Sequence, residues 1–452
     1  MKSKLYTLVS ILVAMVMILT ACAKETEAPP PPTVEVEEIT LATEVPPTEE
    51  PPTVRYCDDD LSGETIYFHS QAGLTGPLST ILGTQFVNAL NDGIGEINAT
   101  GGICGATVEL HLTDTQYDPE QEITTFLQTV AEFPNLMMIA TYGSGATIAL
   151  KDMVVENQVV NMCAGLNAAA AYDPPNGYTV MDYPIYPDQF GGFLLFISEE
   201  WETIKPEGAG DDIVVGVLGW EGPFGAGATT PKALAYAESL GITVLPLETQ
   251  AVSAEADVVT PLQSMALQGA NVIYIQSLGF GPAQVIGTLH ALDMWNSVVV
   301  GGVNWAMNTD VLTYLGASAP AAIGMYGVFP YKWWNDTDVL GVQMALAAFE
   351  AGGYPDTDKG VSYLTAYAGM WGFKTIAELA IDTVGFENLD GEAYMNAFEE
   401  LGTVDNLGIW SYDIRDGSRA PHVTQIRQAQ MVDGAVQFVM VRDFFELPDL
   451  RP

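Results

Sequence analysis

The chain has 452 residues, of which 48% are hydrophobic, and its formal net charge at pH 7 is −42 because 15 Lys and Arg face 57 Asp and Glu. A chain this acidic repels the phosphates of nucleic acids and the anionic head groups of lipids, which excludes nucleic-acid binding as its role. The length exceeds what one simple core accommodates, so two lobes are expected in the globular part.

The first residues of the chain are typical of a secretion signal. Lys2 and Lys4 precede an apolar run over residues 5–19, which ends in Leu-Thr-Ala-Cys at residues 19–22. A short basic region, an apolar core and small residues before a cleavage point distinguish such a signal from a membrane-spanning helix. The Cys directly after Leu-Thr-Ala resembles the lipobox of bacterial lipoproteins, which implies cleavage after residue 21 and a lipid on Cys22. An ordinary signal peptide with a Cys there by chance is the alternative.

Residues 23–54 consist almost only of Pro, Glu, Thr, Val and Ala. Such a composition cannot bury a core, and its Pro-Pro pairs stiffen the chain. Residues 22–54 are therefore predicted to be a disordered acidic stalk that carries the body, residues 55–452, outside the cytoplasm. No later apolar run reaches the roughly 18 residues that span a bilayer, so the N-terminal lipid would be the only link to the membrane.

Three further cysteines lie in the body, and outside the cytoplasm a pair of them can oxidise. Cys57 comes just before the first expected strand and Cys104 just before the second, so both are expected at one edge of one sheet. They either form a disulfide or stay free, since spacing alone does not give the Cα separation that a bridge needs. Cys163 is expected to be a buried small residue. The four His are scattered, and without CxxC or HxxxH patterns neither a metal nor a cofactor is predicted.

Strands and helices alternate along the body. Strands are predicted over residues 65–71, 107–113, 136–141, 159–163, 213–219, 242–247, 272–276 and 298–301, and helices over residues 82–98, 120–132, 147–157, 232–240, 258–268, 282–292, 339–351 and 364–384. This alternation indicates βαβ units, and the two series of strands predict an α/β fold with two doubly wound parallel-sheet lobes. Near the C-terminus, Asp433-Gly434 between two alternating stretches is a strong signal for a hairpin with a two-residue turn.

Three motifs in the first half give the body a family resemblance. Leu-Thr-Gly-Pro at residues 74–77 follows the first strand, EINATGGICG at 96–105 closes the first helix, and DTQYDP at 114–119 follows the second strand. In this order they resemble the solute-binding proteins of branched-chain amino acid ABC importers, the leucine/isoleucine/valine-binding class of type I periplasmic binding proteins. The resemblance starts near residue 65, reaches the C-terminus and thins after Gly324.

The resemblance implies two lobes joined by three crossings, with the ligand in a cleft between them. The first lobe would comprise residues 55–182 and 328–406, and the second residues 183–327 and 407–452. The carboxyl ends of the strands would point to the cleft, where open α/β sheets generally bind ligands.

In the first lobe, the family holds the carboxylate of an amino acid with a loop after the third strand. Residues 141–147 match this loop, with Ser144 at the place of the family's carboxylate-binding Ser and Tyr142 and Gly143 beside it. A strand that ends in small residues before a helix also offers backbone N–H groups to an anion. Gly165 and Asn167 fall where the family uses a backbone carbonyl and a Thr. Tight packing of small residues between strand and helix is the alternative for both loops.

In the second lobe, Phe224 matches an aromatic residue that covers the ligand in the family, with packing inside the lobe as its alternative. Leu278 lies in another loop that the family uses to line the cleft, and Trp305 follows the strand after it. Amino acid binders place a carboxylate near this point for the ammonium of the ligand, whereas this chain has Asn304. Because a buried unpaired ammonium is costly, either another acid serves or the ligand is not an α-amino acid.

Glu221 and Asp188 are the candidate substitutes for that acid. Together with Tyr142, Trp220, Trp305 and Tyr363, the sequence predicts an aromatic-rich cleft. Such a cleft suits a larger apolar or aromatic carboxylate, an amide, or a cation over aromatic faces.

Enzyme motifs are missing from the sequence. The glycines on either side of Ser144 are adjacent to it and do not form a nucleophile elbow, and residues 219–227 lack the Gly-Lys-Ser/Thr of a phosphate loop. The sequence therefore predicts a monomeric, lipid-anchored, extracytoplasmic binding subunit of an ABC importer, with a small-molecule ligand and membrane permease subunits as partners. A sensory receptor on the same scaffold is the first alternative, and a secreted enzyme on this fold is the second.

Overall fold

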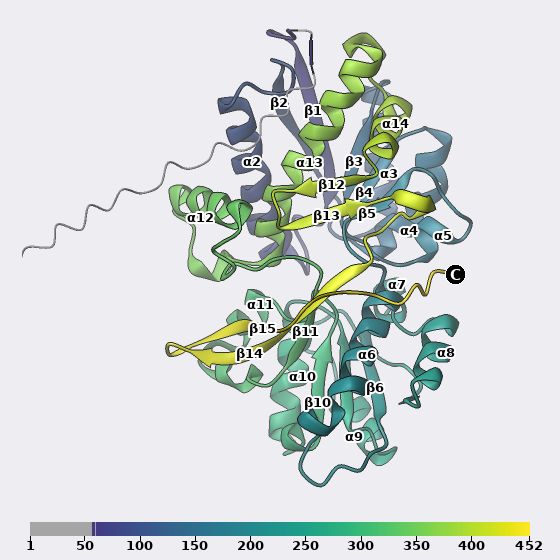
Figure 1. Cartoon of the computed structure of the whole chain (residues 1–452), viewed down its shortest axis with the longest axis vertical. Helices are drawn as coiled ribbons and strands as arrows, with labels where there is room; N and C mark the ends of the chain where they lie inside the picture. Colours follow the sequence, from purple (N-terminus) through teal and green to yellow (C-terminus); the bar gives the residue numbers. More distant parts are fainter. Residues whose placement is uncertain (1–56, 59) are drawn as a thin grey trace, which may run out of the picture. The chain divides into compact units, whose positions relative to one another are not determined.

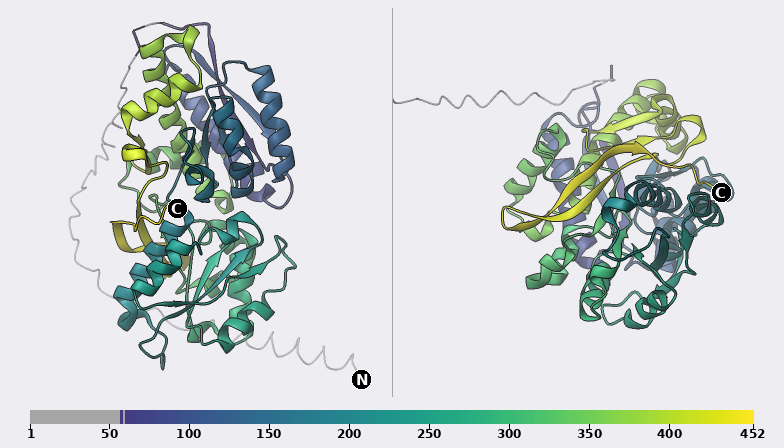
Figure 2. Two further views of the ribbon diagram at one scale, coloured as in Figure 1. Left: turned by 90° about the vertical axis from the view of Figure 1, so that its right-hand side faces the viewer. Right: turned by 60° about the horizontal axis from the view of Figure 1, so that its bottom comes forward.

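Two parallel sheets organise the part of the chain that this computed structural model describes, residues 57–58 and 60–452. Figure 1 shows β1 to β5 in one lobe and β6 and β10 in the other, and the two groups stay apart when the view is turned by 90° (Figure 2). The predicted signal peptide, Cys22 and the stalk lie outside the described residues. No described helix is both long and apolar enough to cross a membrane.

The first lobe is built on a five-stranded sheet in the order β2-β1-β3-β4-β5, with every pair parallel. Its strands are β1 (Thr65–Ala72), β2 (Thr107–Asp114), β3 (Met138–Thr141), β4 (Val160–Cys163) and β5 (Thr179–Met181). The helices are α2 (Val87–Ala99), α3 (Pro119–Glu132), α4 (Ser144–Glu156) and α5 (Ala169–Tyr172), joined later in the chain by α12 (Leu340–Gly352), α13 (Val361–Val384) and α14 (Gly391–Leu401). Every residue of β4 and β5 is buried, as expected for a parallel sheet covered on both faces.

The second lobe repeats this construction with the order β10-β9-β6-β7, and β8 pairs with the carboxyl end of β6. Its strands are β6 (Val214–Trp220), β7 (Thr243–Val244), β8 (Glu248–Gln250), β9 (Val272–Gln276) and β10 (Val299–Gly302). Its helices are α6 (Tyr186–Ile204), α7 (Pro223–Ala226), α8 (Pro231–Ser239), α9 (Val259–Leu267), α10 (Phe280–Ala291) and α11 (Thr309–Leu315). The two-lobed, parallel α/β fold predicted from the sequence is therefore confirmed.

Three crossings join the lobes. The chain passes to the second lobe between β5 and α6, returns after β11 (Tyr326–Phe329) to α12, and passes again toward β14 (Val423–Val432), which pairs with β11 and β15 (Ala435–Glu446). The predicted boundary at residue 406 falls inside a hairpin, because β12 (Thr403–Asn406) pairs with β13 (Trp410–Asp413). We propose that the third crossing lies after β13.

Several local predictions are present in the structure. Asp433 and Gly434 have φ of 49° and 83°, the left-handed conformations that a two-residue hairpin turn requires. Cys57 and Cys104, which the sequence left open between a disulfide and free thiols, form a disulfide with their Cα atoms 5.5 Å apart, and Cys163 is buried and free as expected. Apart from these predictions, the structure shows that the Asp118 side chain caps α3 by accepting from the backbone N–H of Glu120 at 2.7 Å.

Other elements were not predicted. They are the strands β5, β8, β11, β12 and β13 and the helices α5, α6, α7, α11 and α14. The predicted helix 82–98 is present, with a π-helical turn over Ile81–Phe86 before α2. The first nine residues of α6, from Tyr186 to Leu194, are all buried, so this helix lacks the alternation of polar and apolar faces that marks a surface helix in a sequence. The strands concerned are only three or four residues long. Both kinds of element give weak signals in a single sequence.

Candidate functional site

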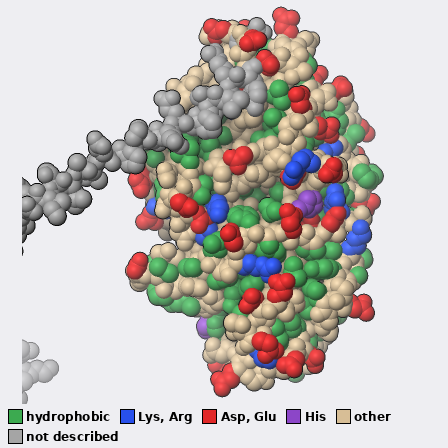
Figure 3. All heavy atoms as spheres, in the orientation of Figure 1, with side chains coloured by type: hydrophobic (Ala, Val, Ile, Leu, Met, Phe, Trp, Pro, Cys, Tyr) green, Lys and Arg blue, Asp and Glu red, His purple; other side chains and the backbone are tan. Residues whose placement is uncertain are grey.

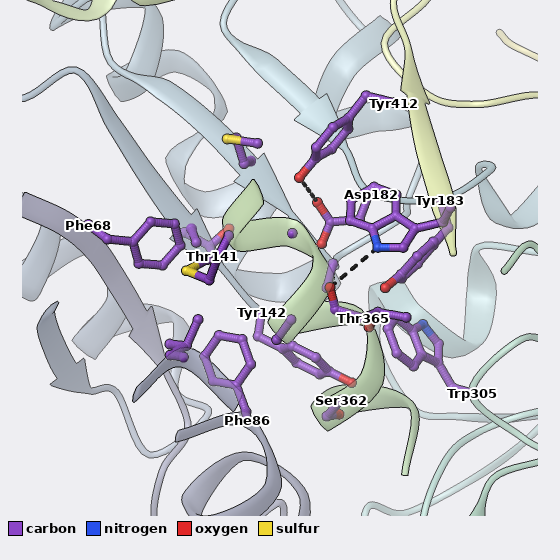
Figure 4. Close-up of a pocket in the computed structure, with 18 residues that line it drawn as sticks. Phe68, Phe86, Thr141, Tyr142, Asp182, Tyr183, Trp305, Ser362, Thr365 and Tyr412 are labelled. Carbon is purple, nitrogen blue, oxygen red and sulfur yellow. Dashed lines mark hydrogen bonds between the residues drawn. The ribbon is translucent and has the colours of Figure 1, made fainter. Parts of the chain in front are cut away.

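An aromatic pocket lies at the carboxyl edge of the first sheet. Its empty volume is about 580 Å³, and its lining includes Tyr142 after β3, Asp182 and Tyr183 after β5, and one face of α13. From the second lobe, Trp305 alone contributes, from the loop after β10. Figure 4 shows these side chains converging from separate elements on the same space. The aromatic members of the lining are Phe68, Phe86, Tyr142, Tyr183, Trp305, Trp410 and Tyr412.

The rings of the aromatic pocket pack on one another. The Trp305 ring centroid lies 5.4 Å from that of Tyr142 and 5.5 Å from that of Tyr183. On the other side, Tyr183 lies 5.3 Å from Trp410, which lies 4.4 Å from Tyr412 in an edge-to-face contact. Tilted and edge-to-face contacts at these distances are favourable and hold the rings in fixed orientations. The pocket therefore has a rigid wall, with Trp305 as the side chain that joins it from the other lobe.

Asp182 is the acid of the aromatic pocket. The Tyr412 hydroxyl donates a hydrogen bond of 3.0 Å to its Oδ1, which is drawn in Figure 4. Burial raises the pKa of the Asp182 carboxyl from 3.8 to about 7, and the bond from Tyr412 opposes this rise. A carboxyl of this kind in an aromatic hollow marks a candidate functional site. Asp182 was not predicted as a site residue, because it follows β5, a strand of three residues that was not predicted either.

A second hollow has an empty volume of about 520 Å³. Residues 145 and 146 of the predicted anion loop, residues 141–147, line it. It lies between Tyr117 and Glu122 of the first lobe and Trp220, Glu221 and Phe224 of the second. The Glu122 carboxylate is buried and both oxygens are used, since it accepts bonds of 2.6 Å from the Thr115 hydroxyl and the Gln71 amide. Burial raises the pKa of Glu122 to about 7.

The predicted anion loop is tightly packed. Gly143 has φ of 109°, and a Cβ there would lie 2.6 Å from a ring carbon of Tyr117; a Cβ on Gly165 would lie 2.4 Å from the Gly143 carbonyl oxygen. The Ser144 side chain is buried, and its Oγ lies 3.5 Å from the Tyr186 hydroxyl. Gly143 and Gly165 are thus tightly packed, as the alternative interpretation of both loops expects. Tyr142, in the same loop as Gly143, lines the aromatic pocket.

Other predicted residues lie at the meeting of the lobes. The Asn167 amide donates to the Pro223 carbonyl of the second lobe at 2.7 Å. Phe224 lines the second hollow, and its ring lies 5.2 Å from that of Tyr186. Leu278 is buried and borders neither hollow. Only Trp305, among the residues predicted from the second lobe, reaches the aromatic pocket.

Asn304 is fully buried and borders neither hollow. Its backbone N–H donates to Gln189 Oε1 at 3.1 Å, and its carbonyl accepts from the Tyr331 hydroxyl at 2.8 Å. Both polar atoms of its side-chain amide lack a hydrogen-bond partner among the described residues.

Tyr363, predicted as a site residue, does not line the aromatic pocket. Its hydroxyl donates to Asp92 Oδ2 at 2.6 Å, and its ring packs against Trp334 and Phe349 inside the first lobe. Helical geometry explains its position, because residues 362, 365, 366 and 369 share the face of α13 that lines the pocket, and residue 363 lies on another face.

Asp188, one of the two candidate substitute acids, borders neither hollow. Its Oδ1 accepts from the Leu450 backbone N–H at 2.8 Å, and its Oδ2 lies 3.4 Å from His422 Nδ1. Both oxygens are thus directed to the C-terminal part of the chain. Glu221 is exposed and stands beside the second hollow.

The comparisons with known proteins agree with this architecture. A family model described as periplasmic binding protein matches residues 72–435, and no curated protein matches the chain significantly. A branched-chain amino acid ABC transporter protein from Thermus thermophilus with bound valine is 20% identical, with a TM-score of 0.72 over 86% of this chain and 98% of its own.

The descriptions of two further similar structures name other classes of solute. A fatty acid ABC transporter substrate-binding protein from Thermomonospora curvata is 20% identical, with a TM-score of 0.68 over 87% of this chain and 95% of its own. A solute-binding protein of an ABC transporter from Rhodopseudomonas palustris BisB5, in complex with 3,4-dihydroxybenzoic acid, is 17% identical, with a TM-score of 0.67 over 85% of this chain and 98% of its own.

Proposed function

Since the chain belongs to the periplasmic binding protein family, we propose that it is the solute-binding subunit of an ABC importer, anchored outside the cytoplasm by a lipid on Cys22. The family and its structural neighbours are substrate-binding proteins and not enzymes. The observation that carries the proposal is the aromatic pocket, in which the first lobe forms the walls and Trp305 of the second lobe completes them.

We propose that solute binding closes the lobes. In the described state, several hydrogen bonds connect them away from the aromatic pocket, among them Asn167 to the Pro223 carbonyl at 2.7 Å, Gln85 to Asp310 at 2.7 Å, and the Thr80 and Tyr314 hydroxyls at 3.2 Å. Such bonds exist only when the lobes meet, so a solute that draws Trp305 onto the pocket also favours them. The closed form is the one that permease subunits would then recognise.

The proposed solute has an apolar or aromatic body, because seven aromatic side chains line the pocket. The structural neighbours support a broad choice of body, since their descriptions name valine, a fatty acid and a dihydroxybenzoic acid. Asn304 stands where a carboxylate is expected in amino acid binders and Asp188 is committed to His422 and Leu450. Leucine, isoleucine and valine are therefore proposed to be poor ligands.

A thermal-shift screen of small solutes tests the proposal. A true ligand at 100 times its Kd stabilises the folded protein by about 2.7 kcal/mol, which is readily measured. Trp305→Ala should remove most of the shift without unfolding the apo protein. A library that contains amino acids, amides, aromatic acids and amines and that produces no shift at all would contradict a solute-binding role.

The lipid anchor is tested separately by metabolic labelling with a lipid analogue. The wild-type chain should be labelled and Cys22→Ala should not. Equal labelling of the two chains would contradict the anchor and leave the binding proposal in place.

A further inference from the structure

We propose that the solute is a cation, an amine with an apolar body, and that Asp182 is its counter-charge inside the aromatic pocket. The inference rests on the proposed binding function and names the class of solute. The sequence left a cation open as one of three solute classes and did not point to Asp182, and the relatives' descriptions name an amino acid, a fatty acid and an aromatic acid.

The charges around the two hollows favour a cationic solute. Of the described residues that line the aromatic pocket and the second hollow, none is Lys, Arg or His, whereas Asp182 lines the first and Glu122 and Glu221 line the second. A solute carboxylate would lose its hydration there, meet no positive partner and stand near an acid. An ammonium group would find a carboxylate within an enclosed space. The charges therefore favour a cation over the aromatic carboxylate that the sequence also allowed.

The aromatic rings of the pocket also favour a cation. Trp305, Tyr142 and Tyr183 form one connected group with centroid separations of 5.4 and 5.5 Å. Trp and Tyr faces attract cations through their quadrupoles, most strongly when water is excluded, and they also cover the apolar groups attached to an amine. All three side chains are at least nine-tenths buried. The pocket thus combines a half-buried carboxylate with the ring types that best accept a cation.

The Asp182 carboxylate has few partners among the residues that the structure describes. Its Oδ1 accepts from Tyr412, and no other hydrogen bond reaches this carboxylate from the described part of the chain. The titratable groups around it are Cys163, Tyr183 and Tyr412, and burial raises the pKa of each, so all three are neutral at pH 7. Among the described residues, no neighbouring cation compensates the carboxylate, and a bound ammonium would supply the missing charge.

The surface supports capture of a cation over longer distances. Asp and Glu outnumber Lys and Arg by 57 to 15, and Figure 3 shows acidic side chains spread over the visible face of the molecule. A strongly negative protein raises the local concentration of cations and their rate of association, and salt weakens this effect. The net charge, which excluded nucleic acids as partners, is favourable for an amine.

Calorimetry with matched probes tests the inference on the full chain in detergent. The probes are amines, carboxylates and primary amides built on four bodies: butyl, cyclohexylmethyl, phenethyl and indolylethyl. At pH 8 at least one amine should bind, and its matched carboxylate and amide should bind at least tenfold more weakly. Asp182→Asn, which keeps the size of the side chain, should weaken the amine at least tenfold, and Glu221→Gln should leave it unchanged. Thermal unfolding of each variant reports whether it is folded.

Three outcomes would overturn the inference. They are equal binding of an amine by wild type and Asp182→Asn, a larger loss in Glu221→Gln, and a panel in which no amine binds. If a carboxylate or an amide binds instead and Trp305→Ala removes that binding, the cation is refuted and the solute-binding function stands. If neither this panel nor the wider solute screen gives a ligand, the proposed function itself fails.

Discussion

The two hollows beside residues 141–146 differ in how the lobes build them. The aromatic pocket is made by the first lobe and the crossings, with Trp305 as the single contribution from the second lobe, whereas the second hollow is shared about equally between the lobes. Their acids differ as well, since both Glu122 oxygens are hydrogen-bonded within the first lobe and Asp182 accepts one bond from Tyr412. A pocket made in one lobe keeps its shape when the lobes separate, so it can bind first and be covered afterwards.

Trp305→Ala should have the largest effect on solute binding. Removing a buried aromatic anchor from a binding site typically costs 2–4 kcal/mol, so we expect a loss of about 30-fold or more in affinity. Phe224→Leu is the matched control, because Phe224 lines only the second hollow. A larger loss in the control, measured by calorimetry with the same solute, would move the site from the aromatic pocket to the second hollow.

Asp182→Asn should stabilise the protein without ligand. Its folded pKa, about 7, lies above the ordinary 3.8, so the folded state holds this proton more tightly and ionisation disfavours folding. The penalty grows between pH 4 and 7 and is complete above pH 7. We expect a gain of about 1–3 kcal/mol in the free energy of unfolding at pH 8, and a smaller one at pH 4. Denaturant titrations at the two pH values check this, and a loss of stability at pH 8 would refute it.

The affinity for an amine should depend on pH in a defined direction. Binding of a cation requires ionised Asp182, and the ionised fraction falls as the pH drops through about 7. With Cys163, Tyr183 and Tyr412 neutral throughout, affinity should be about tenfold lower at pH 6 than at pH 8 and level off above pH 8. The dependence should disappear in Asp182→Asn. Calorimetry that shows tighter amine binding at pH 6 would contradict the role of Asp182.

The bonds between the lobes should have the smallest effect. Gln85→Ala removes the bond to Asp310 and should weaken solute binding by about 0.5–1.5 kcal/mol, because that bond stabilises only the closed state. Tyr363→Phe is the control, since its hydroxyl bonds Asp92 within the first lobe and should change stability but not affinity. Equal affinity in wild type and Gln85→Ala would show that closure does not depend on this bond.

The sequence predicted the sheets well because their central strands are apolar, β-branched and separated by helices of ordinary length. It did not predict α6, which is buried over its first nine residues, or the short strand β5. Because β5 was not predicted, Asp182 could not be recognised as a residue at the carboxyl end of a strand.

Among the predicted site residues, Tyr142 and Trp305 follow strands that the sequence predicted, and both line the aromatic pocket. Tyr363 was misplaced because a residue on a helix that is buried almost all round can face either way. Trp410 and Tyr412 lie on β13, a four-residue strand in a hairpin that joins the pocket from far along the chain. Contacts of this kind follow from tertiary packing, which no local pattern encodes.

A crystal structure of the protein with a solute identified by the thermal-shift screen tests the central claim most directly. We expect the solute in the aromatic pocket, with its apolar body against Trp305, Tyr142 and Tyr183 and a nitrogen within hydrogen-bonding distance of Asp182. A solute in the second hollow, against Trp220 and Phe224 and with the aromatic pocket empty, would contradict the claim.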